Sequence, residues 1–532
     1  MIRDLHLPWL ELSIFTPLLA ACICLWLRNQ QQAQRVALIT SVLTAGFTIG
    51  EWVDFSTLES FAAQDRGSLF RLLLGLEPLV IDELSAPLLP MVAILFALTI
   101  SATMRSKATR FFFGLTMASE AIILATLSCS IPLLLVGLLL VSVIPPWLEI
   151  RARGHSTRMF SLYLFTHVLL LAIGLALLAV GGDSAFVANV AASLLLLSSL
   201  IRAGVFPAHS WIVDLFDKAT FGTALLFVAP MTGAYVVMRL VLPVVPVWAL
   251  HGVAVLSLLT SVYAAGMALV QADARRLFAF LLLSHSSLVL VGLELANPIG
   301  MTGALCIWLA NGISLTGFAL TIRSVEARIG RVSLEQYHGL FDHMPHIGAM
   351  FLLTGLASIG FPGSLAFFGM ELLIEGTSEV YPIVGTIVVL TAVLNGITVL
   401  HAYFRIFTGT RHVATIPLNA RPAERFALLS LSLIVLAAGL WPGASVTSRH
   451  HAAEMLLKFR QQSGVDAGDP SSSPDQPSAL EQMLKIDEEE NANQDEAEHQ
   501  EMGEGVDEDV DEDRDDEHAA PAEATSTPPH DS

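Results

Sequence analysis

The sequence predicts an all-α polytopic membrane protein with about 14 transmembrane helices, each about 20 residues long. Of its 532 residues, 54% are hydrophobic and only 14% are charged, whereas a soluble protein carries about 25% charged residues. The first apolar run lacks a basic leader and a small-residue cleavage site, so we expect a helix there rather than a signal peptide. We expect helices over residues 9–27, 34–52, 83–104, 111–127, 131–149, 160–180, 185–205, 222–243, 250–271, 277–293, 300–322, 346–361, 383–404 and 424–442.

Basic residues occupy every second connection between these helices. Eighteen fall in one set of connections and only Arg66 and Arg71 in the other. Because Lys and Arg concentrate on cytoplasmic loops, the alternation supports the helix count. It predicts a multi-pass protein of the cell inner (cytoplasmic) membrane with both termini on the extracytoplasmic side. The eighteen are Arg28, Arg35, Arg105, Lys107, Arg110, Arg151, Arg153, Arg158, Lys218, Arg275, Arg276, Arg323, Arg328, Arg331, Arg405, Arg411, Arg421 and Arg425.

The end of the chain has a different composition. After Gln461 there are 24 of the 48 acidic residues, against Lys485 and Arg514 as the only basic ones. A segment this acidic and rich in Pro, Ser and Ala cannot bury a core. We therefore expect residues 462–532 to form a disordered acidic tail. Calcium or a partner protein bound to this tail is the alternative interpretation.

Several classes of site are absent from the sequence. The four cysteines, Cys22, Cys24, Cys129 and Cys306, do not have the spacing of metal ligands. There is no Walker loop, dinucleotide fingerprint, haem-attachment motif or iron–sulfur cysteine run. We expect no metal, no redox cofactor and no catalytic residues, and neither nucleotide nor nucleic acid as a ligand. Any energy input would then come from a partner or from an ion gradient.

Two apolar segments are interrupted by proline. The first, IRAGVFPAHSW over 201–211, breaks at Pro207, and the second, ASIGFPGSLAFFG over 357–369, breaks at Pro362 and Gly363. Proline removes a backbone donor and clashes with the preceding turn. In lipid, the freed carbonyls need partners from protein or water. Paired breaks therefore indicate an ion path at the interface of inverted repeats; two ordinary proline kinks are the alternative.

Ionisable side chains at membrane depth are costly and therefore mark candidate positions on an ion path. Arg202 lies about one helical turn before the first break, and Glu371 follows the second break. His285, in LLLSHSSLVL, could relay protons because imidazole titrates near neutral pH. We take these three as the candidate ion path. For the others, Glu120, Arg239, Glu294, Glu375 and His401, a structural role is the simpler interpretation.

Five stretches together resemble one known family. FPAHSWIVDLFDKATFGTALLF (206–227) and MTGAYVVMRLVLPVVP (231–246) resemble the antiporter-like subunits of complex I and of Mrp cation/proton antiporters, most closely the M-type NADH-quinone oxidoreductase chain. The other three, VIDELSAPLL (80–89), QADARRLFAFLLLSHSSLVLVG (271–292) and IGFPGSLAFFGMELLI (359–374), follow the family's order. The resemblance covers about residues 75–410 and implies inverted five-helix repeats with discontinuous seventh and twelfth helices.

Combined with the helix spacing, the resemblance divides the chain into five parts. These are the N-terminal helices (1–110), a first antiporter-like repeat (111–245), a second repeat (246–410), the last helix with its extension (411–461), and the acidic tail (462–532).

The resemblance also implies an ion path, from which this chain departs. In the family the path uses a glutamate on helix 5, lysines on helices 7 and 8, and a glutamate or lysine on helix 12. A gap-free alignment places an apolar residue or an arginine at each position, and the family's helix 11 histidine is also lost. Since leucine cannot titrate and arginine holds its proton, we expect an impaired first half-channel and any flux in the second half. The positions are Leu140, Arg202, Met231 and Met370, with Glu371 beside Met370 and Asn311 replacing the histidine; Ser284 and His285 are retained.

Three functions remain open. The first is a proton- or cation-translocating subunit of a complex I or Mrp-type assembly, surrounded by other membrane subunits and lipid. The second is the membrane subunit of a two-component inorganic carbon transporter, whose partner would be a soluble zinc enzyme on the cytoplasmic face. The third is a non-conducting scaffold that kept the fold and lost the path. None of the three gives this chain redox chemistry of its own, so it is at most a subunit of an NADH-quinone oxidoreductase-like enzyme.

Overall fold

Membrane-length helices dominate the computed structural model, which describes residues 3–58, 60–75, 77–104, 111–180, 184–410 and 419–462. These residues belong to one unit, Met1–Ser472. The predicted acidic tail lies outside the described residues, apart from Gln462, as do the predicted cytoplasmic residues Arg105, Lys107, Arg110 and Arg411.

In the described part, eleven helical segments are long and apolar enough to cross a membrane, and three shorter helices are also apolar. They coincide with the stretches predicted above, so the all-α membrane fold is confirmed. The number that crosses a bilayer stays a prediction. In chain order the helices are α1 (Trp9–Trp26), α2 (Gln30–Thr57), α3 (Leu69–Leu74), α4 (Leu88–Ser101), α5 (Phe113–Ser128), α6 (Pro132–Ser142), α7 (Ile144–Ala152), α8 (Arg158–Val180), α9 (Ala185–Ala203), α10 (Ser210–Lys218), α11 (Phe221–Val228), α12 (Thr232–Val236), the π-helical turn η2 (Val237–Val241), α13 (Val247–Leu269), α14 (Ala274–Glu294), α15 (Pro298–Ile329), α16 (Pro345–Ser358), α17 (Leu365–Val380), α18 (Pro382–Phe407), α19 (Pro422–Leu440) and α20 (Pro442–Gln462).

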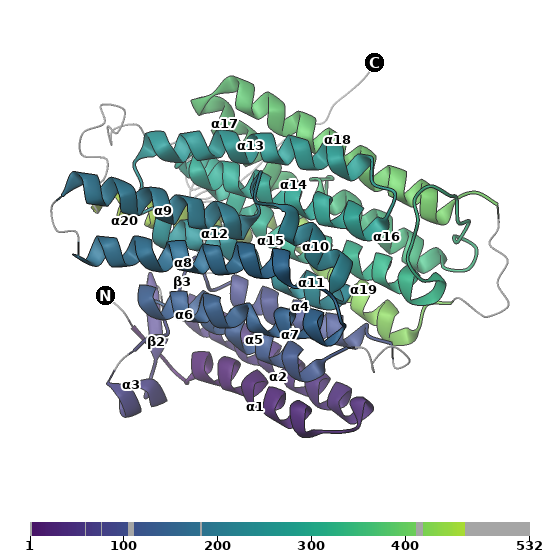
Figure 1. Ribbon diagram of the computed structural model, residues 1–532, viewed down its shortest axis with the longest axis horizontal. Coiled ribbons are helices and arrows are strands. Elements are labelled where there is room, and N and C mark those ends of the chain that lie inside the picture. The colour runs from purple at the N-terminus through teal and green to yellow at the C-terminus, as the bar shows by residue number, and fades with distance from the viewer. Residues whose placement is uncertain are drawn as a thin grey trace, which may run out of the picture. The chain divides into compact units, whose positions relative to one another are not determined.

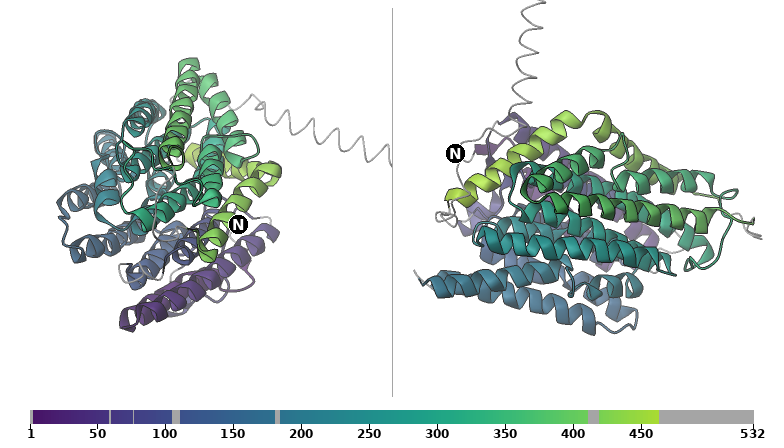
Figure 2. Two further views of the ribbon diagram at one scale, coloured as in Figure 1. Left: turned by 90° about the vertical axis from the view of Figure 1, so that its right-hand side faces the viewer. Right: turned by 90° about the horizontal axis from the view of Figure 1, so that it is seen from above.

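The long helices lie side by side, with α1 and α2 along the lower edge of Figure 1 and α17 and α18 along the upper edge. Three segments form the interior of the bundle: α14 is 94% buried, and α15 and the α11–η2 segment are each 89% buried over their most apolar window. The outer helices α2 and α8 are only 28% buried. Figure 2 shows the same helices from two further sides. Polar groups on α14 and α15 are therefore shielded from lipid by a surrounding layer of helices.

A small sheet, which the sequence did not predict, lies beside the start of α1. Its strands are β1 (Arg3–Leu5), β2 (Ala62–Asp65) and β3 (Ile81–Asp82), in the order β1-β2-β3. β1 pairs with β2 in parallel, and β2 pairs with β3 in antiparallel register. The sheet ties the chain start to the connection between α2 and α4. It also places the Asp65 carboxylate at the start of α1, where it accepts from Leu10 N at 3.1 Å and Glu11 N at 2.8 Å.

Helices α15 and α17 pack through glycines. A Cβ added to Gly303 on α15 would lie 2.7 Å from the carbonyl oxygen of Gly369 on α17, and one added to Gly376 would collide with the backbone of Gly300. Small residues let transmembrane helices approach to backbone contact. This contact fixes α17, the second half of the interrupted helix, against the buried α15.

We expect Gly376→Ala to lower the thermal stability of the purified protein, because the new methyl group meets rigid backbone. Overpacking of this kind costs about 1–3 kcal/mol. Gly252→Ala on α13 is the matched control, since nothing lies within 4 Å of its added Cβ. Thermal unfolding in detergent measures both, and equal stabilities of the two variants would contradict the packing argument.

A pH effect is expected at Asp65, which lies in β2, outside the membrane-spanning helices. Burial raises the pKa of Asp65 to about 6, although the backbone N–H groups of Glu11, Leu10 and Trp9 lower it. The folded state therefore binds this proton more tightly than the unfolded state, whose pKa is 3.8. The resulting stability is present below pH 3.8 and is lost as pH rises through 6.

A shift of this size corresponds to roughly 3 kcal/mol. We expect Asp65→Asn to flatten the fall in stability across this pH window, measured by thermal unfolding in a pH series. Asp4→Asn, at an exposed position of β1, should leave the pH profile unchanged. A profile that is the same in Asp65→Asn as in the parent protein would contradict the assignment.

Candidate functional site

The first interruption separates α9 from α10. Gly204 ends α9 in the left-handed conformation, with φ +77°, and the Phe206–Pro207 peptide bond that follows is cis. Neighbouring side chains bond the freed backbone groups: Trp211 Nε1 donates to Ile201 O at 2.9 Å, and Phe206 N donates to Thr260 Oγ1 at 3.1 Å. Backbone groups that lose their helical hydrogen bonds at this interruption thus find partners inside the protein, as the bilayer requires.

The second interruption separates α16 from α17. Its loop holds Pro362 and Gly363, and Gly360 and Gly363 both have positive φ, +87° and +89°. Ser364 Oγ lies 2.8 Å from Phe361 O, to which it donates. Each predicted break residue therefore lies in a loop between two helices.

Arg202 lies at the end of α9, just before the first interruption, and only 5% of its surface is exposed. Its guanidinium carbon lies 4.3 Å from the ring centroid of Phe227 and 5.7 Å from that of Trp211. Across the described part of the chain, no carboxylate forms an ion pair with it. The side chain faces a small cavity that is also lined by Met231, the position of the lost helix 8 lysine.

His285 lies on α14 and is 2% exposed. Its Nδ1 lies 2.8 Å from Leu281 O, and because a carbonyl oxygen only accepts, Nδ1 is the donor of this bond. Beside it, Asn395 of α18 donates to Ser284 Oγ at 2.9 Å, and Ser284 donates to Ser261 O at 2.9 Å. These bonds join α13, α14 and α18 through polar side chains in the bundle interior.

Several polar atoms in this interior have no hydrogen-bond partner among the described residues. They include both side-chain atoms of Asn311 on α15, Ser287 Oγ on α14 and Asn395 Oδ1 on α18. All three residues lie in helices that are long and apolar enough to cross a membrane. We refer to His285, Ser287, Asn311 and Asn395 as the interior polar row.

Glu371 does not join this row. It is exposed on α17, whereas its neighbour Met370 is 8% exposed and faces the interior. The structure thus brings Arg202 and His285 into the bundle and leaves Glu371 on its surface. Glu375 is exposed on the same helix.

The position aligned with the lost helix 5 glutamate also lies on the surface. Leu140 on α6 is 38% exposed, while the preceding Leu139 is 1% exposed. Both side chains are apolar, so neither register supplies an acid from this helix.

Four other predicted ionisable residues each have a partner, although Glu120 Oε1, Glu294 Oε1 and His401 Nδ1 have none among the described residues. Glu120 accepts from Ser41 at 2.6 Å, Glu294 accepts from Ser257 at 2.7 Å, and Arg239 pairs with Asp82 at 2.6 Å. His401 Nε2 lies 3.3 Å from Arg405 Nε and accepts its hydrogen.

Buried ionisable residues that the sequence did not single out include three inside apolar helices. His167 on α8 is 1% exposed, and its Nδ1 lies 2.8 Å from Ser198 Oγ. Glu149 accepts from Thr220 N at 2.7 Å at the end of α7. Glu51 is fully buried on α2 with both oxygens unbonded in the described structure. A lone histidine or glutamate inside an apolar helix was the available signal for each.

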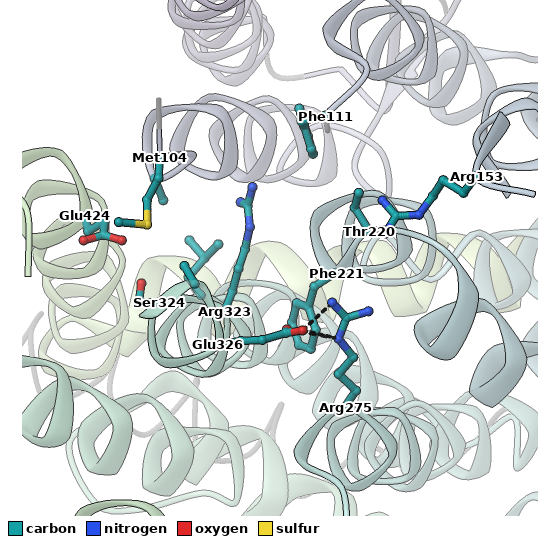
Figure 3. A pocket seen from close by; sticks show the side chains of 13 residues that line it. Met104, Phe111, Arg153, Thr220, Phe221, Arg275, Arg323, Ser324, Glu326 and Glu424 are labelled. Atoms are coloured by element: carbon teal, nitrogen blue, oxygen red, sulfur yellow. Dashed lines mark hydrogen bonds and ion pairs between the residues drawn. The ribbon is translucent and has the colours of Figure 1, made fainter. Parts of the chain in front are cut away.

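A cavity of about 160 Å³ lies where several basic connections meet (Figure 3). Arg153, Arg275 and Arg323 line it, and it shares Ala102, Met104 and Glu424 with a neighbouring cavity of about 450 Å³ beside Arg35 and Arg421. Basic residues from distant connections therefore gather at one end of the bundle, as the predicted charge alternation requires.

Arg275 connects the first interrupted helix to the interior. Its Nε bonds Glu326 Oε1 at 2.9 Å, as Figure 3 shows, and its Nη1 donates to Phe216 O at 3.1 Å and Ala219 O at 3.3 Å. The two carbonyls belong to the C-terminal end of α10. One guanidinium thus joins α10, α14 and α15.

A helical bundle with two interrupted helices and a buried polar row is the architecture of a membrane-embedded transport subunit. Residues 88–395 match the family described as NADH:quinone oxidoreductase/Mrp antiporter, transmembrane, and the chain belongs to this family.

Relatives from several organisms support this assignment. NADH-quinone oxidoreductase subunit M of Rickettsia typhi is 26% identical over 269 residues, which is 49% of this chain and 54% of the relative. This chain therefore matches only about half the length of that relative. The NAD(P)H-quinone oxidoreductase chain 4 1 of Picosynechococcus sp. is 25% identical over 493 residues, 84% of this chain and 91% of the relative.

Two solved structures share the fold. A chain of respiratory complex I from Thermus thermophilus superposes with a TM-score of 0.73 at 21% identity, covering 85% of this chain and 99% of that one. A chain of the Mrp complex from Dietzia sp. gives a TM-score of 0.74 at 19% identity, covering 86% and 99%.

Arg275→Met should destabilise the protein more than Arg275→Lys, because methionine removes both the ion pair and the carbonyl bonds. Lysine keeps the charge but cannot form the bidentate pair and also reach two carbonyls. Breaking a fully buried pair costs about 3–5 kcal/mol, and this pair is partly exposed, at 16% for each side chain, so we expect a smaller loss. Thermal unfolding measures the order, with Arg276→Met at a half-exposed arginine as the control. Equal losses in all three variants would contradict this role.

Proposed function

We propose that this chain moves protons, or another cation, as an antiporter-like subunit of a multi-subunit membrane assembly of the complex I or Mrp type. The observation that carries the proposal is the interior polar row, with its unbonded amide and hydroxyl groups in the most buried helices. Unbonded polar groups cost several kcal/mol in a bilayer. Water molecules that bond them would form a hydrated route, and His285 can exchange protons with it.

The proposed route runs through the second repeat. There the polar row lies on α14, α15 and α18, near the second interruption. In the first repeat, Leu140 faces outward and Met231 lines the cavity beside Arg202. Arginine keeps its proton, so the family's acid and lysine positions in this repeat hold no residue that titrates near neutral pH. His167 is a buried titratable group there, but it does not occupy one of those positions. We therefore infer an impaired first half-channel within repeats at 111–245 and 246–410.

Glu371 lies outside this route, and we assign it to a contact with a neighbouring subunit. Glu371, Glu375 and Glu379 are exposed and follow one another by one helical turn on α17. Carboxylates at membrane depth are costly against lipid and almost always face protein or water. We infer that a neighbouring membrane subunit with basic or hydrogen-bonding side chains covers this face. The structural relatives are themselves named as parts of respiratory and Mrp complexes, which supports a membrane partner.

The proposed orientation places the basic end of the bundle in the cytoplasm and both termini outside. The meeting of basic connections around the two cavities supports it. A soluble partner at this end, as in the inorganic carbon transporter hypothesis, would also contact these cavities.

Proton flux in liposomes that contain the purified assembly tests the proposal. We expect His285→Ala to reduce proton flux at least ten-fold and to leave the assembly intact. Loss of a positioned proton-transfer group typically lowers a rate by about 10²-fold or more. His346→Ala, at an exposed position in the first turn of α16, is the control and should leave flux unchanged.

Glu371→Gln should reduce co-purification of the neighbouring subunit and leave flux per assembled complex near the parent value. Unchanged flux in His285→Ala would sink the proposed route. An assembly without any flux in the parent protein would select the scaffold hypothesis instead.

A further inference from the structure

Arg202 differs from the other buried arginines in what it contacts. Among the described residues, three arginines are buried: Arg202, Arg449 and Arg460. Arg449 donates to the carbonyls of Glu83 and Leu84, and Arg460 donates to the carbonyl of Leu242. Arg202 has neither a carbonyl nor a carboxylate partner in the described structure, and its guanidinium lies over the faces of Phe227 and Trp211.

These ring contacts do not balance the charge. A desolvated cation–π contact contributes about 2 kcal/mol. Burying an ion costs several kcal/mol even after relaxation, and lipid on the far side of the surrounding helices adds no screening. A permanently charged guanidinium in this position therefore needs a negative partner or a hydrogen-bond acceptor from outside the described chain.

A cavity is present where such a partner would bind. It measures about 20 Å³ and is lined by Arg202, Met231, Thr232 and Ser286, among others. The hydroxyl of Thr232 forms no hydrogen bond within the described residues, so it is free to donate. A cavity of about 10–15 Å³ accommodates one water-sized particle. The space therefore has room for a water molecule or a monatomic anion.

We propose that this cavity binds one monovalent anion of the size of chloride, held by the Arg202 guanidinium with the Thr232 hydroxyl as a second donor. The anion neutralises the fixed charge beside the first interruption, in the space between α9, α10, α11, α12 and α14. This proposal is independent of the proposed proton route, because anion binding can be measured in a protein that carries no proton flux.

Halide-dependent thermal stability of the purified full-length assembly tests the site. Chloride replaces gluconate at constant ionic strength, and we expect the melting temperature to rise to a plateau, with bromide giving the same response. Arg202→Met should abolish the response and should melt above the parent protein in gluconate, because it removes an uncompensated buried charge. Arg151→Met is the control and should keep the response; Arg151 also packs on a tryptophan, 5.2 Å from the Trp147 ring, but it is exposed.

If Arg202→Met does not fold, the milder variant Thr232→Val tests the same site. Thr232→Val should raise the half-saturating chloride concentration about ten-fold, as expected for one lost hydrogen bond to an ion. Anomalous diffraction from bromide-soaked crystals should show a peak between Arg202 and Thr232. The proposal is overturned by an equal halide response in Arg202→Met, by a response to bicarbonate alone, or by a cavity that contains only water in saturating bromide.

Discussion

The bilayer requires every backbone and side-chain polar group at membrane depth to find a partner within the protein or in trapped water. Both interrupted helices obey this requirement. Trp211 and Thr260 bond the backbone around the first break, and Ser364 bonds it at the second. Arg275 adds bonds to the far end of α10. The breaks are therefore stable features of the fold, and they bring non-helical backbone into a bundle otherwise made of closed helices.

The same constraint explains which helices carry polar residues. α14 and α15 are shielded on nearly all sides, so His285 and Asn311 can remain there without facing lipid. The glycines between α15 and α17 let these two helices pack at backbone distance, so α17 covers α15 closely. On the outer helix α17, Glu371 remains at the surface, where the proposed neighbouring subunit would cover it. Buried polar residues such as His285 are thus candidates for a proton route, whereas exposed acids such as Glu371 are candidates for contacts with other subunits.

The two breaks differ in electrostatics although they share a backbone design. Beside the first, Arg202 supplies a charge that does not titrate near neutral pH, and the small cavity in front of it offers room for an anion. Near the second, His285 and neutral amides supply groups that accept and release protons or bind water. The proposals made for the two breaks therefore differ: a fixed charge neutralised by an anion at the first, and a hydrated route at the second.

The sequence by itself predicted the apolar helices of membrane length, the positions of both breaks, the charge alternation and the family, because each depends on local composition, residue order or motif spacing. Helix α17 was not among the predicted helices. Only the tertiary structure decided which side chains share the interior. Adjacent positions on a helix point about 100° apart, so Met370 faces inward while Glu371 faces outward, and a gap-free alignment cannot separate them. The missing partner of Arg202 and the burial of His167 were likewise undecided, because both depend on contacts between helices distant in the chain.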